Sequence, residues 1–129
     1  MPRYLIQKPW GWTEQVTNEL MFASHRIDIN PGRSCSWHHH RHKWNGFACV
    51  TGTLVIDVVD GCVSGPPDKY ETIVLSPGDT YDVPPCKTHR MRALPTGSAH
   101  GLEYYWPDGR IALSDGDIVR VSPSGEIVL

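Results

Sequence analysis

Glycine and proline interrupt this chain at short intervals, and this spacing limits what it can fold into. The 129 residues include 12 glycines and 11 prolines, and both residues break helices. Between turn signals such as PG, DG and SG lie short runs rich in β-branched and aromatic residues, which are typical of strands. We expect strands at residues 25–29, 34–40, 47–50, 53–59, 71–75, 80–83, 88–93, 102–106 and 118–121. One helical turn is expected over Thr13–Leu20, with Thr13 as its cap.

This pattern indicates an all-β protein with a single domain. The length is that of one ordinary domain, and regular short strands without long helices favour a barrel or a sandwich. We therefore expect one domain over residues 1–129. It would have an entry segment at 1–24, a barrel at about 25–121 and a short C-terminal tail.

Charge and composition exclude several classes of function. The net charge is −2 and the pI is near 6.4, with both signs mixed along the chain, which argues against nucleic-acid binding. No apolar run approaches the roughly 20 residues of a membrane span. The start, MPRYLIQKPWG, lacks the apolar stretch of a signal peptide. We therefore expect a cytoplasmic protein without membrane or nucleic-acid partners, whose cysteines are reduced.

Four histidines lie together in the run Trp37–His42. Alternate residues of a strand face the same way, so His38 and His40 would share one face and His39 would take the other. Two imidazoles placed in this way can converge on one metal ion. Neutral imidazole suits zinc, iron, copper and nickel and, more weakly, manganese. The run therefore predicts a metal site.

The spacing around these histidines is specific. It reads G–x5–H–x–H–x4–N–x6–G over Gly32–Gly52 and G–x5–P–x4–H over Gly78–His89. Both stretches resemble the two signature motifs of the cupin superfamily. The resemblance implies a double-stranded β-helix, or jelly-roll barrel. It also implies that His38, His40 and His89 bind one divalent metal ion, whether Zn, Fe, Mn or Ni. Asn45 stands where the motif has a Glu, as an optional, weaker fourth ligand.

Four short segments narrow the resemblance to one group of cupins. These segments are KPWGW at 8–12, INPGRSCSWHHHR at 29–41, VTGTLVI at 50–56 and SDGDIVRVSPSG at 114–125. They are similar to the C-terminal cupin domain of type II mannose-6-phosphate isomerases. This similarity implies an isomerase of sugars or sugar phosphates, with the small-molecule ligand inside the barrel. Two alternatives stay open: an iron dioxygenase with a three-histidine site, and a cupin that binds a small ligand without turnover.

Aldose–ketose isomerisation needs an electrophile and a base that moves a proton between adjacent carbons. The base candidates are Tyr81, Glu103 and Tyr104. A substrate phosphate favours a cation such as Arg41, which directly follows the histidine run.

Further cations flank the predicted ligands. Lys43 follows the histidine run, and alternation directs Arg90 and Arg92 away from the face that carries His89. Cys86 occupies a turn position where the second cupin motif usually has Gly. Small cupins commonly pair as homodimers, and the segment 3–12 would lie along a neighbouring barrel or along its own.

Overall fold

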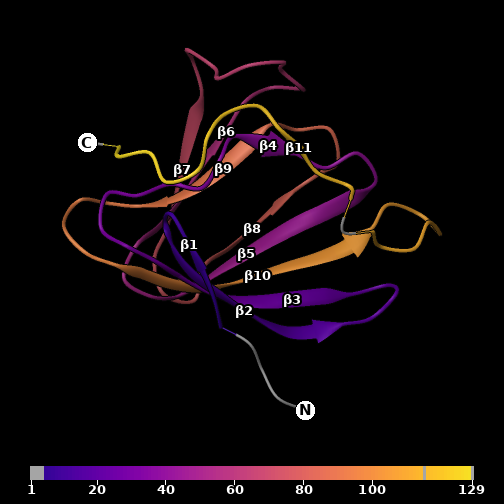
Figure 1. Ribbon diagram of the computed structural model, residues 1–129, viewed down its shortest axis with the longest axis horizontal. Helices are drawn as coiled ribbons and strands as arrows, with labels where there is room; N and C mark the ends of the chain where they lie inside the picture. The colour runs from indigo at the N-terminus through magenta and orange to yellow at the C-terminus, as the bar shows by residue number, and fades with distance from the viewer. Residues whose placement is uncertain (1–4, 115, 129) are drawn as a thin grey trace.

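Two antiparallel sheets form the protein. The computed structural model describes residues 5–114 and 116–128, and every regular element among them is a strand. One sheet has six strands in the order β1 (Leu5–Lys8), β2 (Gly11–Asn18), β3 (Ala23–Ile29), β10 (Ala99–Pro107), β5 (Lys43–Thr51) and β8 (Thr80–Val83). The other has five strands in the order β11 (Val119–Arg120), β4 (His38–His39), β9 (His89–Ala93), β6 (Leu54–Val58) and β7 (Glu71–Leu75). Figure 1 shows the five-stranded sheet above the six-stranded one.

The apolar core lies between the two sheets. Its fully buried side chains alternate along the strands, as Ile27 and Ile29 do on β3 and as Leu54 and Ile56 do on β6. Phe47, 0% exposed, fills the centre from β5. Each such side chain contributes about 1.5–3 kcal/mol through removal of apolar surface from water. The all-β prediction is confirmed.

The helical turn predicted over Thr13–Leu20 is wrong. This stretch falls largely in β2, which pairs with β3 as an antiparallel hairpin. Thr13 is buried and opposite Ile27, so its side chain does not cap a helix. The partner strand pairs with most of the segment up to Asn18, with one shift in register between Gln15 and Thr17, whereas a lone helical turn would leave most of the backbone groups unpaired. Helix propensity is a property of the segment alone and takes no account of the partner strand.

The predicted strand at 34–40 is shorter in the structure, where β4 holds only His38–His39. The segment before it makes an isolated bridge from Ser34 to Arg92. It also makes backbone hydrogen bonds to the C-terminal segment, including Val121 N to Trp37 O at 2.8 Å and Ser34 N to Glu126 O at 3.1 Å. His40 therefore lies just beyond β4.

The predicted entry segment at 1–24 supplies β1 and β2, which extend the six-stranded sheet at its edge. Trp10, between these strands, is 5% exposed and packs in the core of its own barrel. Residues 1–4, the first part of this segment, lie outside the described residues, as do Asp115 and Leu129.

An ion-pair cluster covers the outer face of the five-stranded sheet. Asp57 on β6 is 0% exposed and accepts hydrogen bonds from Arg90 Nε at 2.8 Å and Arg92 Nε at 2.7 Å. The Thr72 hydroxyl donates to the same carboxylate at 2.8 Å. The two arginines thus point away from the face that carries His89, as alternation along the strand predicts.

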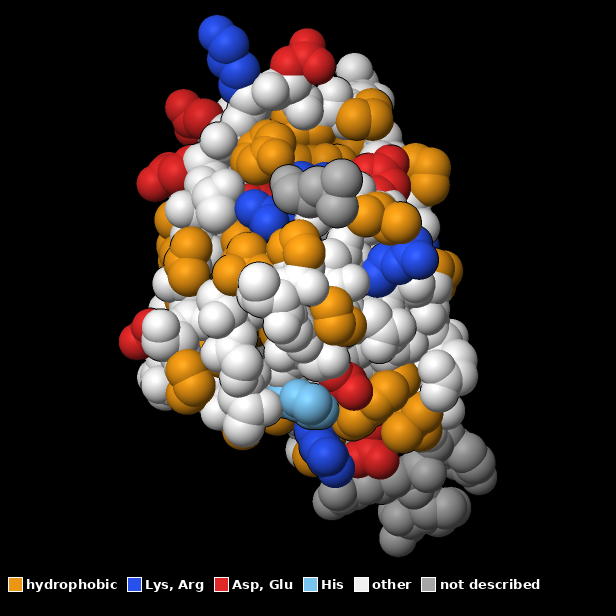
Figure 2. All heavy atoms as spheres, turned by 90° about the vertical axis from the view of Figure 1, so that its left-hand side faces the viewer, with side chains coloured by type: hydrophobic (Ala, Val, Ile, Leu, Met, Phe, Trp, Pro, Cys, Tyr) orange, Lys and Arg blue, Asp and Glu red, His pale blue; other side chains and the backbone are white. Residues whose placement is uncertain are grey.

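The surface carries charges of both signs. On the face shown in Figure 2, acidic and basic side chains are interspersed with apolar and polar ones. This mixture agrees with the balanced composition of the chain. Among the described residues, no helix is long and apolar enough to cross a membrane.

Candidate metal centre

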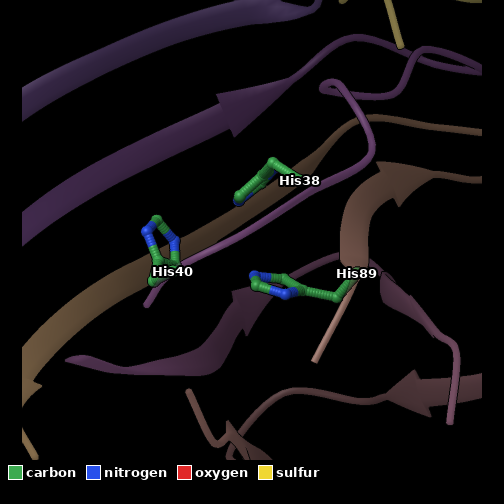
Figure 3. Close-up of side chains that lie close together, drawn as sticks. All are labelled: His38, His40 and His89. Carbon is green, nitrogen blue, oxygen red and sulfur yellow. The ribbon is translucent and has the colours of Figure 1, made fainter. Parts of the chain in front are cut away.

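His38, His40 and His89 converge inside the barrel (Figure 3). His38 on β4 is directly opposite His89 on β9, and His40 follows two residues after His38. One nitrogen of each ring lies within 4.8 Å of one nitrogen of each of the others. All three side chains are buried, at 6%, 3% and 1% exposed. The sequence spacing therefore predicted a cluster that the fold does assemble.

Backbone carbonyl groups fix the orientation of all three rings. The Nδ1 acceptors are Ser36 O for His38 at 2.7 Å, Asp117 O for His40 at 2.8 Å and Lys87 O for His89 at 2.8 Å. Because a carbonyl oxygen only accepts, each Nδ1 carries the proton. In the neutral rings the lone pair is then on Nε2. Histidine ligands in metal sites are commonly oriented in this way.

Burial keeps these imidazoles neutral. It is the largest cause that lowers the pKa of His40 to about 4 and that of His89 to about 3. The pKa of His38 also lies well below its usual range, because of burial and then the neighbouring His89 and His40. A metal ion binds neutral imidazole, so no proton has to leave before binding at neutral pH.

The contact between Asn45 and His89 shows why a cation fits here. Asn45 Oδ1 is 3.0 Å from His89 Nε2, and both groups are buried. The amide Nδ2 of Asn45 donates to Tyr104 O at 3.4 Å, and a second hydrogen bond joins the side chains of Asn45 and Glu103. These two bonds keep Oδ1 directed at His89. Neutral His89 has its one proton on Nδ1, so two lone pairs face each other.

The Nε2 atom of His40 is buried and receives no hydrogen bond from a protein donor, although the nearby Asn45 side chain also acts on this ring and raises its pKa. A divalent cation would satisfy this atom, and it would also relieve the opposed lone pairs of Asn45 and His89. Unpaired buried polar atoms are costly and call for an explanation of this kind. The donor set of three imidazoles and one amide oxygen suits a first-row divalent metal. The three-histidine cluster therefore suggests a divalent metal site, and the neutral oxygen of Asn45 lies beside it.

A second group of interactions positions His40. The backbone oxygen of Asp117 accepts from its ring, and the carboxylate of the same residue accepts from Arg41 N at 2.7 Å and from His42 N at 2.9 Å. Asp117 thus holds both the ring and the turn that follows it. Nothing in the local sequence around the histidines indicates this residue, which is 77 positions from His40.

A cavity of about 330 Å³ opens beside the histidines. His38 and His40 line one wall of it. The other described lining residues are Lys8, Trp10, Thr13, His25, Cys35, Ser36, Lys43, Met91, Glu103, Tyr105, Ile118, Arg120 and Ser124. This volume is in the range of small-molecule sites.

Glu103 is the one carboxylate among the described residues that line this cavity. It projects inward from β10 and is 8% exposed. Burial is the largest effect on its pKa, which is raised, while His25, Tyr105, Asn45 and Lys43 act in the opposite direction. The hydroxyl of Tyr105 donates to Glu103, and burial followed by the Glu103 charge raises the pKa of Tyr105 well above its usual value. Glu103 thus lines the cavity and also forms a hydrogen bond with the side chain of Asn45.

Two cations border the same cavity. Lys43 Nζ lies 4.4 Å from the centre of the Tyr105 ring. Arg120 on β11 is directly opposite His38, so the two side chains share the inner face of the sheet. The charge of Arg120 is among the smaller causes that lower the pKa of His38. Both cations stand where an anionic group on a ligand would benefit from them.

The other predicted site residues lie elsewhere. Tyr104 stands on the opposite face of β10, where its ring stacks on Trp106 and covers Gly46. Tyr81 packs against the apolar core, and Arg41 is exposed. None of these three side chains lines the cavity.

Tyr105, Lys43 and Arg120 do line it. Tyr105 was recognisable from alternation, because it lies two residues beyond Glu103 on the same strand. Arg120 had no local signal, because its place depends on the pairing of β11 with β4.

Comparison with known proteins agrees with this arrangement. Residues 25–105 match the Cupin domain family. A 53-residue stretch is 32% identical to a mannose-1-phosphate guanylyltransferase from Sinorhizobium fredii; it covers 41% of this chain and 10% of that protein. The chain therefore spans only about a tenth of the curated relative that it matches.

Solved structures share the fold at low sequence identity. The capsular polysaccharide assembling protein CapF from Staphylococcus aureus superposes with a TM-score of 0.75 at 17% identity, over 95% of this chain and 32% of that one. Oxalate decarboxylase from Bacillus subtilis superposes with a TM-score of 0.72 at 17% identity, over 92% and 30%. At such identity the likeness shows the fold alone, and this chain covers about a third of each of those proteins.

Proposed function

This chain belongs to the cupin family, and from that premise we propose that it is a metal-dependent isomerase of a small sugar that carries an anionic group, such as a sugar phosphate. The observation that carries the proposal is the position of Glu103. A carboxyl group with a raised pKa lines the same cavity as His38 and His40. Isomerisation requires this combination of an electrophilic centre and a proton-transfer group.

His38, His40 and His89 would hold the ion, with Asn45 Oδ1 as the fourth protein group. A divalent ion at this position would supply Lewis-acid polarisation to a carbonyl or hydroxyl oxygen of the sugar. Because all four ligands are neutral, its charge would not be reduced by the protein. The buried rings and their backbone hydrogen bonds keep the ligand atoms in place before any ion arrives.

Glu103 is the group that would move a proton between adjacent carbons of the sugar. Its raised pKa brings the carboxyl closer to neutral pH, where a general base and the acid formed from it work best. Tyr105 donates a hydrogen bond to this carboxyl and so orients it. The Asn45 side chain also bonds to it, which fixes the base relative to the ligand cluster.

Arg120 and Lys43 would bind the anionic end of the substrate. Arg120 lies on the inner face beside His38, and a guanidinium binds phosphate or carboxylate through two parallel hydrogen bonds. Lys43 lies on the wall with Tyr105. This placement puts positive charge on the cavity lining without using Arg41, which does not line the cavity.

The test begins with metal analysis of untagged protein, followed by assays of mannose 6-phosphate and of mannose as substrates. We expect one divalent ion per chain and isomerisation of the phosphorylated sugar. Glu103→Gln should lower kcat at least about a hundredfold, the typical contribution of a general acid–base group, with metal content unchanged. Tyr104→Phe is the matched control, because the neighbouring ring faces the other side of β10; it should leave kcat unchanged.

Three results would count against the isomerase. Full activity in Glu103→Gln would remove the proposed base. Iron in the protein together with substrate-dependent oxygen uptake would favour the dioxygenase alternative. Tight binding of a sugar phosphate with no turnover would favour a cupin that only binds its ligand.

A further inference from the structure

Two exposed cysteines lie beside each other, and neither lines the cavity. Cys62 follows β6 and Cys86 precedes β9, and both are free thiols. Cys62 Sγ donates to the backbone oxygen of Cys86 at 2.9 Å. The side chains also interact: burial and then the neighbouring Cys86 thiol raise the pKa of Cys62. The fold thus brings together two thiols that are 24 residues apart.

Backbone hydrogen bonds hold the two segments in register. Thr88 N donates to Gly61 O at 3.0 Å, and Val59 N donates to Thr88 O at 2.9 Å. Val63 N donates to the Thr88 hydroxyl at 3.1 Å. These contacts lie on both sides of Cys62 in the sequence. The proximity of the thiols therefore follows from the backbone and does not depend on one side-chain rotamer.

Cys86 holds a conformation that favours glycine. Its φ is 61°, and among the described residues it is the one non-glycine residue with a positive φ. A glycine would relieve this strain, so the chain keeps a thiol where the backbone favours none. The other two cysteines differ: Cys35 and Cys49 are buried at 6% and 3% exposed. They act as small apolar side chains.

We propose that Cys62 and Cys86 form a reversible dithiol modification site, which reacts with low-molecular-weight disulfides to form an intramolecular disulfide. The exposure of both thiols, their direct contact and the backbone register that holds them carry this proposal. It does not depend on the isomerase function or on the metal.

The reaction consists of two balanced exchange steps. One thiol loses its proton, and its sulfur attacks a sulfur of oxidised glutathione; a protein–glutathione disulfide forms and one glutathione thiolate leaves. The second protein thiol, deprotonated in turn, attacks the cysteine sulfur of that mixed disulfide and displaces the other glutathione. The two protein thiols lose two electrons, which reduce oxidised glutathione to two glutathione molecules. Excess dithiothreitol reverses both steps.

The crosslink would act on the turn next to the metal centre. Cys86 N donates to His40 O at 2.7 Å, and His89 lies three residues after Cys86. A disulfide to Cys62 would tether this turn to the end of β6. Local opening of the turn would become rarer, so the backbone amide of Cys86 would exchange its hydrogen more slowly.

The experiment treats the full chain with oxidised glutathione and maps disulfides by mass spectrometry under non-reducing conditions. We expect a Cys62–Cys86 crosslink, loss of two hydrogen atoms from the intact mass, no retained glutathione, and unmodified Cys35 and Cys49. In Cys62→Ser the reaction should stop at one glutathione on Cys86. In Cys86→Gly, which also relieves the positive φ and so keeps the fold, it should stop at one glutathione on Cys62.

Several results would overturn the proposal. Glutathione retained separately on both cysteines would show that the thiols do not meet. A crosslink between two chains would also overturn it, and so would the absence of any reaction at either thiol. Hydrogen exchange of the Cys86 amide at equal rates in the oxidised and reduced protein would overturn the tethering of the turn.

Discussion

The two faces of β9 hold polar clusters of opposite kinds. On the inner face, His89 meets His38 and His40, and their rings are neutral and leave ring nitrogens that no protein donor satisfies. On the outer face, Arg90 and Arg92 pair with Asp57, and every charge has a partner at 2.7–2.8 Å. Both clusters are largely buried, with Arg92 only half-buried, and their side chains point to opposite faces of one strand.

The difference distinguishes a cluster that stabilises the fold from a cluster that is suited to binding. A buried cluster whose groups satisfy one another can be explained by stability alone. A buried cluster that leaves lone pairs opposed, as between Asn45 and His89, is arranged so that a cation could bind between them. The outer cluster should therefore govern folding, while the inner cluster should govern what the protein binds. The following predictions test this division in order of decreasing effect on stability.

Acid should destabilise the metal-free protein through the inner cluster. The folded pKa values of His40 and His89 are about 4 and about 3, below the ordinary value of 6.5. Between these values the unfolded chain binds more protons than the folded one, so stability is present above pH 6.5 and is lost as pH falls through this window. The loss should be roughly 3 kcal/mol from each histidine. Thermal unfolding after chelation, from pH 7 to pH 4, measures it.

The control for acid is the variant His89→Ala, whose unfolding curve should depend less steeply on pH. A melting temperature of the metal-free wild type that stays constant down to pH 4 would contradict the neutral state of these rings.

Asp57→Ala should break the outer cluster. It leaves the charges of Arg90 and Arg92 partly buried without their carboxylate, which costs about 3–5 kcal/mol. Urea denaturation measures the loss. Below the unfolding temperature the metal content should stay unchanged, because this face contributes no ligand.

Arg26→Ala is the matched control for that change. It removes a half-exposed arginine from its ion pair with Glu14 at 3.3 Å, and surface pairs contribute only up to about 1 kcal/mol. If Asp57→Ala cost no more than Arg26→Ala, the outer cluster would not be the stabilising one.

His38→Ala should have the smallest effect on stability and the largest on metal. It removes a neutral ring that borders the cavity, so water replaces it and no dry void forms. The metal-free protein should unfold within about 1 kcal/mol of the wild type. Metal affinity should fall more than about a hundredfold, beyond the loss typical of a group that only orients a ligand. Unchanged metal content would show that the histidine cluster is not the site.

The sequence predicted the clustering of the three histidines better than it predicted the residues around them. The His-x-His spacing and the motif around His89 depend on neighbours along one strand or turn, and strand periodicity is local. For the same reason Glu103 could be named as a candidate base from the sequence. Strand alternation also predicts that Glu103 and Tyr104, as adjacent residues of β10, face opposite sides, and of these two only Glu103 lines the cavity. The helical turn predicted over Thr13–Leu20 was wrong because this segment becomes a strand through its pairing with β3, which the segment's own sequence does not show.

The amino-acid sequence by itself determined the strand-rich fold, the cupin family and the three histidines that converge. Only the tertiary structure decided four contacts between distant segments. Asn45 directs its oxygen at His89, and Asp117 accepts a hydrogen bond from the ring of His40. Arg120 lies opposite His38, and Cys62 lies against Cys86. The physical reason is the range of the interactions. Periodicity and motif spacing are fixed by a few bonds along the chain, whereas these contacts join segments that only strand pairing brings together.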